Sequence, residues 1–508
     1  LAKDIRMEWM KLGGIQTIHV ELIISGEKYD HDYKITEEAT AAPDIAVPFM
    51  MGMTDEKTMP VVSVWPGRIG EVWKKYYIML DGSKCASGDL LVADSLETTR
   101  SSNNYVVQTS YVPDVIPIVK KLRNNGGEVS IGMITPKLDL PREKPAYLSA
   151  DVAVDFGTSS TRVFAKIEQE IEEIDITADA PLLVTDCDLG REKLMRDYLV
   201  APSSFTRGSD TLFSVYRRSG NLRDTVQPVL DGVIYQPGEV SIVEFIENCD
   251  KLMPDLKWNA KSNRAYYTAF MQQLFLHVAS LLYEKGVNSI KWRYALPENM
   301  EPDMKEIIRD IWKMDMTPYL EDFVGKISFK IDSELTESEA ASRYFLFNRE
   351  SAIHAKKGYL VVDIGGGSTD IALWQGESQN VHMKWHSSVN VAGRKMFTCW
   401  IEKHIEQLCE STQDENITAH LDMINRTTPA LRRTLIEMLL DANCSILLDN
   451  YRQNCLNSQS GWGMELRKEI NLSISFLMFA LGYQVGALIS SGGFDVPDGL
   501  GAFTIAFG

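Results

Sequence analysis

The chain has 508 residues, of which 44% are hydrophobic, and a formal net charge of −18. This length is enough for about three domains with cores of their own. The acidic charge gives no support for nucleic-acid binding, and an anionic membrane surface would repel the chain. The seven cysteines are scattered and form no CxxC pair, which favours reduced thiols in a cytoplasmic protein.

The first 147 residues are predicted to form a small all-β domain. Apolar or alternating runs are separated there by Gly, Asp, Asn and Pro, a pattern typical of short strands; the runs are 16–24, 60–65, 73–80, 105–111 and 128–134. We expect the aromatic residues Trp65 and Trp73 to lie in a core. Residues 136–145, rich in proline and charge, predict a linker to the rest of the chain.

Two matched turns lie far apart in the sequence. The first is Asp155-Phe156-Gly157-Thr158-Ser159-Ser160, and the second is Asp363-Ile364-Gly365-Gly366-Gly367-Ser368-Thr369-Asp370. Each follows one short apolar run and precedes another, which predicts a β-hairpin. Two such hairpins, each led by an aspartate, indicate the two halves of one phosphate clamp.

The residue types in these turns suit polyphosphate. Several backbone N–H groups must converge on the phosphate oxygens, and only a chain with little Cβ bulk approaches closely enough. Serine and threonine hydroxyls add further donors. The predicted phosphate-binding residues are Gly157, Thr158, Ser159, Ser160, Gly365, Gly366, Gly367, Ser368 and Thr369.

Asp155 and Asp363 each end the first strand of their hairpin. Backbone amides and hydroxyls leave the phosphate charge unbalanced, so we expect Mg²⁺, with these two carboxylates holding its water shell. Asp370 is expected to serve the same metal site. The alternative for either motif is an ordinary tight turn with a solvated aspartate, which the pairing of the two motifs makes the weaker interpretation.

These segments resemble the phosphate-one and phosphate-two hairpins of the superfamily of actin, heat-shock-type chaperone ATPases and sugar kinases. Residues 361–372 are most similar to bacterial actin-like and chaperone-like ATPases. The resemblance covers the chain from about residue 150 and implies two ribonuclease H-like lobes after the β domain. Lobe I would be 148–350, with a connecting helix, and lobe II 351–508, with a helical insertion. ATP or ADP with Mg²⁺ is the implied ligand.

Residues 335–345 resemble the connecting helix of this superfamily. The resemblance implies that Glu337 orients the attacking water, with Glu339 in reserve. It also implies a catalytic set made of Asp155, Glu337, Asp363 and Asp370. The two glutamates could equally be first-turn acids that only complement the helix dipole.

Strands and helices alternate after the linker, the pattern of α/β architecture. Helices are expected at 266–285, 304–314, from about 394, through most of 419–458 and at 464–489; strands are expected at 288–296, 326–331 and 381–385. The apolar run 474–489 is too short to span a membrane, so we expect a buried helix in which Gly482 and Gly486 permit close packing. His382 and His386 lie on a predicted strand, where a structural role is favoured over a metal site.

The end of the chain departs from the family pattern. Residues 502–508 predict an apolar strand that ends on Gly508, so we expect the sequence to stop at the first glycine of the adenosine loop. Pairing of this strand in the second lobe's sheet would support that expectation. Placement of Gly492 and Gly493 against the cleft would contradict it. Purine specificity is therefore not assigned.

Three functions compete. The leading one is an actin-like or chaperone-like ATPase in which slow hydrolysis is coupled to lobe closure. A small-molecule kinase would need an aspartate base aimed at a substrate hydroxyl. A non-catalytic assembly protein would use nucleotide as a switch. We expect a protein partner or self-assembly through residues 1–147 or the helical insertion, with no nucleic acid and no membrane span.

Overall fold

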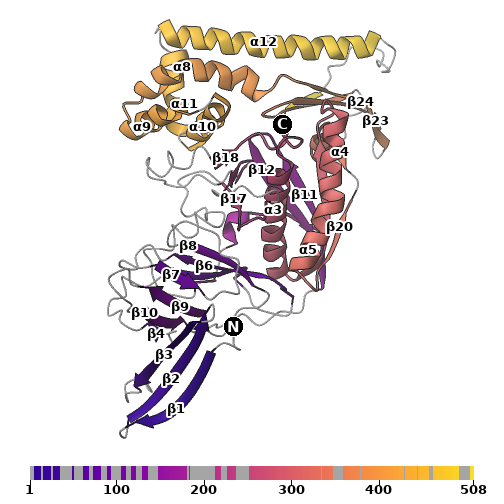
Figure 1. Cartoon of the computed structure of the whole chain (residues 1–508). Helices are drawn as coiled ribbons and strands as arrows, with labels where there is room; N and C mark the ends of the chain where they lie inside the picture. Colours follow the sequence, from indigo (N-terminus) through magenta and orange to yellow (C-terminus); the bar gives the residue numbers. More distant parts are fainter. Residues whose placement is uncertain are drawn as a thin grey trace.

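The computed structural model describes residues 5–12, 15–24, 27–34, 49–50, 61–67, 72–81, 89–92, 104–109, 116–121, 129–134, 147–179, 182–183, 212–218, 226–235, 251–332, 334–346, 358–377, 380–427, 429–442, 444–456, 461–490 and 504–507. Within these residues the chain is a mixed α/β protein, as predicted from the sequence, with several separate sheets (Figure 1).

The first large sheet carries the first predicted hairpin. Its strands are ordered β13-β12-β11-β19-β20, where β11 to β13 form an antiparallel meander and β19 and β20 run parallel to β11. The bounds are β11 Leu148–Phe156, β12 Ser160–Ile167, β13 Glu170–Glu173, β19 Val287–Leu296 and β20 Ser328–Ile331. The short strands β15 (Leu212–Phe213) and β21 (Leu335–Thr336) pair with β12 and β19.

Helix α3 (Arg264–Glu284) packs against this sheet (Figure 1). Its Phe275 ring stacks on Trp292 of β19 with centroids 3.9 Å apart. The helix ends before Gly286, whose φ of +86° suits a residue without a side chain. The predicted helix after it is longer than expected and contains a π-helical turn: α4 (Pro302–Asp310), η6 (Ile311–Met316) and α5 (Thr317–Phe323) follow one another directly.

The second sheet carries the second hairpin and repeats the strand order of the first. Its order is β24-β23-β22-β25, with an antiparallel meander of β22, β23 and β24 and with β25 parallel to β22. The bounds are β22 Tyr359–Ile364, β23 Thr369–Glu377, β24 Asn380–Val389 and β25 Thr504–Phe507. The strand predicted at 502–508 thus pairs in this sheet, as expected, whereas Gly492 and Gly493 lie outside the described residues.

Helix α6 (Glu337–Leu346) joins the two sheets. The strand before it, β21, pairs with β19 of the first sheet, and the helix then packs on the second sheet. Ala341 lies there against a cluster formed by Tyr359, Val361, Ala372 and Trp374. Helix α6 therefore contacts both sheets.

The N-terminal region is built of strands, as expected. One sheet holds β1 (Ile5–Leu12), β2 (Ile15–Ile24) and β3 (Glu27–Lys34); a second holds β4 (Phe49–Met50), β7 (Asp89–Val92), β9 (Ile116–Lys121) and β10 (Val129–Ile134). A third holds β5 (Val61–Trp65), β6 (Tyr76–Asp81), β8 (Asn104–Thr109) and β14 (Leu182–Leu183).

The third of these sheets shares its core with the α3 region. Trp65 and Trp73 are 1% and 4% exposed, which confirms that they are core residues, and they lie in the same hydrophobic cluster as α3 and β19. The Trp65 Nε1 donates to Asp179 at 2.9 Å, and the same carboxylate contacts His277 of α3. The sheet of β5, β6 and β8 is therefore joined to the following part of the chain by buried packing, and the boundary at 147 stays a prediction.

A helical region follows the second sheet, as expected for the predicted insertion. It comprises η7 (Arg394–Thr398), α8 (Cys399–Glu410), α9 (Glu415–Ile424), α10 (Pro429–Ala442), α11 (Cys444–Tyr451) and η8 (Arg452–Leu456). Its hydrophobic core also takes in Phe213, Val215 and Leu252, near the small sheet of β16 (Tyr216–Arg218), β17 (Gly232–Ile234) and β18 (Leu252–Met253).

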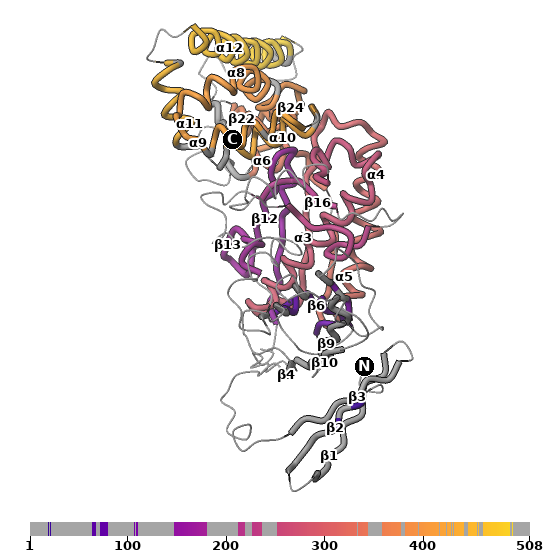
Figure 2. Tube along the Cα trace, turned by 60° about the vertical axis from the view of Figure 1, so that its left-hand side comes forward, coloured from indigo at the N-terminus to yellow at the C-terminus, as the bar shows by residue number. Residues whose placement is uncertain are grey.

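The prediction of a buried final helix was wrong. Helix α12 (Gly461–Ser490) lies across α8 at one end of the molecule in both views (Figure 1, Figure 2). Leu477 and Leu481 pack against the second sheet, but Phe476, Phe479 and Tyr483 are 58%, 71% and 67% exposed. The helix carries apolar side chains of its own on every side, so its sequence did not distinguish the packed side from the exposed side.

The expected packing role of two glycines in α12 was also wrong. A Cβ at Gly482 or Gly486 would meet no atom within 4 Å. The helix is also longer than the apolar run suggested: by length and composition alone, Gly461–Ala487 could cross a membrane, with a mean hydropathy of 1.4 in its most apolar window. A single helix of this kind does not by itself assign the protein to a membrane.

Candidate functional site

The two predicted hairpins have the same register. In the first, Asp155 pairs with Arg162, and Gly157 N–H donates to the Ser160 carbonyl at 2.9 Å. Asp155 therefore lies two residues before the glycine that opens a four-residue turn.

The second hairpin repeats this arrangement. Asp363 pairs with Asp370, and Gly365 N–H donates to the Ser368 carbonyl at 3.0 Å. Asp363 thus occupies the position in the second sheet that Asp155 occupies in the first.

Close approach of the chain requires glycine where these turns begin. A Cβ at Gly157 would lie 2.6 Å from the Ser160 carbonyl oxygen, and a Cβ at Gly365 would lie 3.1 Å from the Ser368 oxygen. Both turns would have to change shape to accept a larger residue, so these glycines maintain the two turns in the same form.

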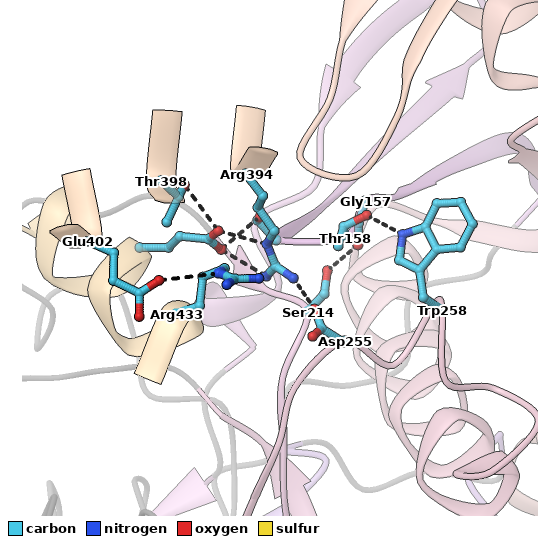
Figure 3. A network of polar contacts seen from close by, with 11 residues as sticks. Gly157, Thr158, Ser214, Asp255, Trp258, Arg394, Thr398, Glu402 and Arg433 are labelled. Carbon is cyan, nitrogen blue, oxygen red and sulfur yellow. Dashed lines mark hydrogen bonds and ion pairs between the residues drawn. The ribbon is translucent and has the colours of Figure 1, made fainter. Parts of the chain in front are cut away.

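The two turns are in contact with each other. A Cβ at Gly366 would lie 2.7 Å from Ser159 Oγ, and one at Gly367 would lie 2.6 Å from Thr158 Oγ1. The indole of Trp258 donates to the same Thr158 oxygen at 2.8 Å (Figure 3). The sequence-predicted phosphate residues are therefore brought together from both halves of the chain.

Four acidic side chains gather beside the turns. Burial and, to a smaller extent, the charges of Asp155 and Asp370 together raise the pKa of Asp363 to about 6. Burial likewise raises the pKa of Glu337 to about 7, with Asp370 and Asp155 contributing in the same direction. Asp370 is 3% exposed, and burial raises its carboxyl pKa as well. All four predicted catalytic acids lie close enough to influence one another electrostatically.

One buried cation lies among these acids. The Lys257 ammonium pairs with Glu337 Oε1, and their side chains are 4% and 17% exposed. Its charge lowers the pKa values of Glu337, Asp363 and Asp370. Arg162, the register partner of Asp155, interacts with that carboxylate from the exposed side. Among the described residues, these two cations face four carboxyl groups, so the site is short of positive charge.

Glu337 and Glu339, the first and second candidates for orienting the attacking water, have different surroundings. Glu339 pairs along the helix with Arg343 at 2.6 Å, and its backbone N–H donates to Thr336 Oγ1 at 3.1 Å. Glu337 instead pairs with the buried Lys257, and the charges of Asp370 and Asp155 contribute to its raised pKa.

Several predicted hydroxyl donors contact protein groups. Ser368 Oγ donates to Asp370 Oδ2 at 3.1 Å, and Thr369, which is fully buried, donates to the Val391 carbonyl. Ser159 Oγ donates to Glu437 Oε2 at 3.0 Å. The Asp370 Oδ1 atom is buried and accepts no hydrogen bond from any described residue.

The residues present fit a hydrated magnesium ion. The orphaned Asp370 oxygen and the raised pKa values of Asp363 and Asp370 all indicate carboxylates that a cation would stabilise. Their ligand oxygens, with that of Asp155, do not all come within 4.8 Å of one another in the described part of the chain.

Another group of possible metal ligands lies on α8 and α12. His404, Glu465 and Glu469 offer ligand atoms within 4.8 Å of one another. Lys403 already pairs with Glu465 at 3.1 Å and with Glu469 at 2.6 Å. We therefore interpret this group as a polar anchor of α12. His382 and His386 lie on β24, as expected.

Sequence reasoning missed four residues of the site: Lys257, Trp258, Arg394 and Glu437. Lys257 and Trp258 follow a turn at Asp255. Arg394 directly follows the second sheet, and Glu437 comes from α10. No local motif marks them; the only signal was a lysine between the apolar residues Leu256 and Trp258.

No protein-family model matches the chain, and no curated protein matches its sequence.

Proposed function

We propose that the chain binds ATP or ADP with Mg²⁺ between its two glycine turns and hydrolyses ATP slowly, with hydrolysis coupled to movement of the two halves. The observation that carries the proposal is the equivalence of Asp155 and Asp363, which lead matching turns that meet. A solvated turn needs no such partner, whereas a phosphate clamp needs both halves.

The repeated sheet supports an actin-like fold for this part of the chain. In both sheets three antiparallel strands are followed by a fourth strand parallel to the first. This is the strand order of a ribonuclease H-like lobe, and the resemblance implied two such lobes. Contacts of helix α6 with both sheets support its proposed role as the connecting helix.

Each group has a role in this proposal. Backbone N–H groups of the two turns and the Thr158 and Ser159 hydroxyls would bind phosphate oxygens. Asp155 and Asp363 would hold the hydrated Mg²⁺, which neutralises phosphate charge during transfer. Lys257 would add a positive charge beside the phosphates, and Glu337 would orient the attacking water.

The ion pair of Lys257 and Glu337 favours a second candidate, a nucleotide switch with negligible turnover. A carboxylate that is held by an ammonium group is a weaker acceptor for a water proton. If the pair persists when nucleotide binds, the clamp closes without hydrolysis. No contact among the described residues favours the small-molecule kinase.

Thermal unfolding and phosphate release with a panel of nucleotides, with and without Mg²⁺, test the proposal. We expect ATP and ADP to raise the Tm only with Mg²⁺, and ATP to release phosphate without an added acceptor. Asp363→Ala should abolish both effects, whereas Asp303→Ala, which changes an exposed acid of α4, should keep them. Stabilisation without phosphate release would favour the switch, and turnover that requires an added acceptor would favour a kinase. No stabilisation by any nucleotide would contradict the proposal.

A further inference from the structure

Arg394 lies where three parts of the chain meet. It follows the second sheet, and its guanidinium pairs with Asp255, which belongs to the segment before α3 (Figure 3). It also pairs with Glu437 of α10, with Nε 2.7 Å from Oε1 and Nη2 2.8 Å from Oε2. The side chains of Arg394 and Glu437 are each 12% exposed. The attraction between charges that are this little exposed to solvent is screened by salt far less than that of a surface ion pair.

The Glu437 carboxylate also reaches the first turn. Ser159 Oγ donates to Oε2 at 3.0 Å, and Thr398 Oγ1 donates to Oε1 at 3.4 Å. Ser159 is one of the hydroxyls that the proposed function assigns to phosphate. In this structure an acidic side chain therefore accepts the hydrogen bond that a phosphate oxygen would accept.

The backbone around Arg394 is attached to the second turn. Its N–H donates to the Gly366 carbonyl at 3.1 Å, and Gly393 N–H donates to the Gly365 carbonyl at 2.9 Å. The guanidinium thus joins the second turn to Asp255 and, through Glu437, to Ser159 of the first turn.

A neighbouring ion pair keeps α10 in place. Arg433 Nε lies 3.5 Å from Glu402 Oε2 of α8 (Figure 3). Arg432 Nε lies 3.5 Å from Oε1 of the same carboxylate. Arg433 precedes Glu437 by one helical turn, so the seating of α10 on α8 determines where the Glu437 carboxylate lies.

We propose that Arg394, Glu437 and Asp255 form an autoinhibitory latch that holds the two turns together and keeps Ser159 from phosphate. This inference rests on the proposed nucleotide site. Because the turns touch, phosphate enters only if they separate, and separation breaks the pairs of Arg394 with Asp255 and of Glu437 with Ser159. The helical region therefore controls access to the clamp, and any partner that moves α10 releases it.

Hydrogen exchange of the nucleotide-free protein and titration with Mg-ADP test the latch. Glu437→Gln keeps the shape of the side chain and removes its charge. We expect faster exchange at 155–162 and 364–371 and about tenfold tighter Mg-ADP binding. Asp255→Asn breaks the latch from the other side and should act in the same direction. Glu465→Gln, on the exposed pair between Lys403 of α8 and α12, is the matched control and should change neither quantity.

The outcomes separate the latch from the clamp. Exchange and affinity in both Glu437→Gln and Asp255→Asn equal to those of the unaltered protein would overturn the latch and leave nucleotide binding intact. Weaker Mg-ADP binding by Glu437→Gln would also overturn it. Faster exchange at the turns with no ADP binding by any form of the protein would support the contact as a latch and contradict the proposed function.

Discussion

Ser159 and Gly366 are in contact across the junction of the two sheets, since a Cβ at Gly366 would lie 2.7 Å from Ser159 Oγ. The first belongs to the turn after β11 and the second to the turn after β22. The two hairpins therefore meet through residues that were predicted from the sequence to bind phosphate.

Substitution of Gly367 by alanine should force the turns apart. The new Cβ would lie 2.6 Å from both Thr158 Oγ1 and Trp258 Nε1. Overpacking of this kind costs about 1–3 kcal/mol. We expect loss of nucleotide affinity in addition, because the new Cβ would block the close approach of phosphate to the backbone N–H groups of this turn. Urea unfolding and nucleotide titration measure the two effects. Gly482→Ala is the matched control: its Cβ meets nothing, so the helix should gain roughly 0.5–1 kcal/mol. Equal responses of the two variants would contradict the described contact.

Removal of the buried lysine should destabilise the protein in a pH-dependent way. Lys257→Met leaves Glu337 without its cation. We expect a loss of about 3–5 kcal/mol at pH 8 and a smaller loss at pH 5.5, where Glu337 is protonated. Lys261→Met is the control, because its pair with Asp303 spans 3.6 Å between side chains that are 65% and 77% exposed. Its effect should stay below about 0.5 kcal/mol. A pH-independent loss for Lys257→Met would argue against the charge cluster.

The acids themselves should make stability fall as the pH rises. The pKa of Glu337 is raised from 4.5 to about 7 and that of Asp363 from 3.8 to about 6. Between the two values of each group the folded chain retains a proton that the unfolded chain has lost. Its contribution to stability is therefore complete below about pH 4 and is lost as the pH rises to about 7. Each group contributes at most about 1.4 kcal/mol per pH unit.

Urea unfolding from pH 4 to pH 8, with and without Mg²⁺, measures this dependence. In the double variant Glu337→Gln with Asp363→Asn, the free energy of unfolding should no longer show the fall with rising pH that these two acids cause. Mg²⁺ with nucleotide should stabilise the unaltered protein more at pH 7.5 than at pH 5.5, since the ion favours ionised carboxylates. Parallel pH curves for the double variant and the unaltered chain would show that these two acids do not titrate as described.

Local patterns predicted the hairpins and the acids that lead them, because strand, turn and strand lie within a few residues of one another. Asp155 and Asp363 could be identified in this way. Lys257, Arg394 and Glu437 could not, because their roles depend on contacts between segments far apart in the sequence. The core position of Trp65 was predicted, but its contact with Asp179 depends on the folded chain.

The last helix shows where composition misleads. Residues 474–489 are apolar on every side, so a buried position was the natural expectation, yet the helix is held by one side only. Trp400 Nε1 donates to Ser473 Oγ at 2.7 Å and Lys403 pairs with Glu469 at 2.6 Å. Polar contacts with α8 therefore position it together with its leucines, and hydrophobicity alone does not indicate such contacts.

Alanine substitutions on the two sides of α12 check this placement. Leu477 is 2% exposed, and its replacement should cost about 2–4 kcal/mol. Phe479 is 71% exposed, and its replacement should change stability by less than about 0.5 kcal/mol. Urea unfolding of the two variants under one set of conditions gives the comparison. A larger loss for Phe479→Ala would mean that the helix packs the other way round.

Calorimetric titration of the protein with ATP in the presence and absence of Mg²⁺ tests the central claim most directly. The account predicts saturable binding of one nucleotide that depends on Mg²⁺ and is lost in Asp363→Asn, with the folded state of the variant checked by its thermal unfolding. Binding that is unchanged by Asp363→Asn, or no binding of ATP by the unaltered protein with Mg²⁺ present, would contradict it.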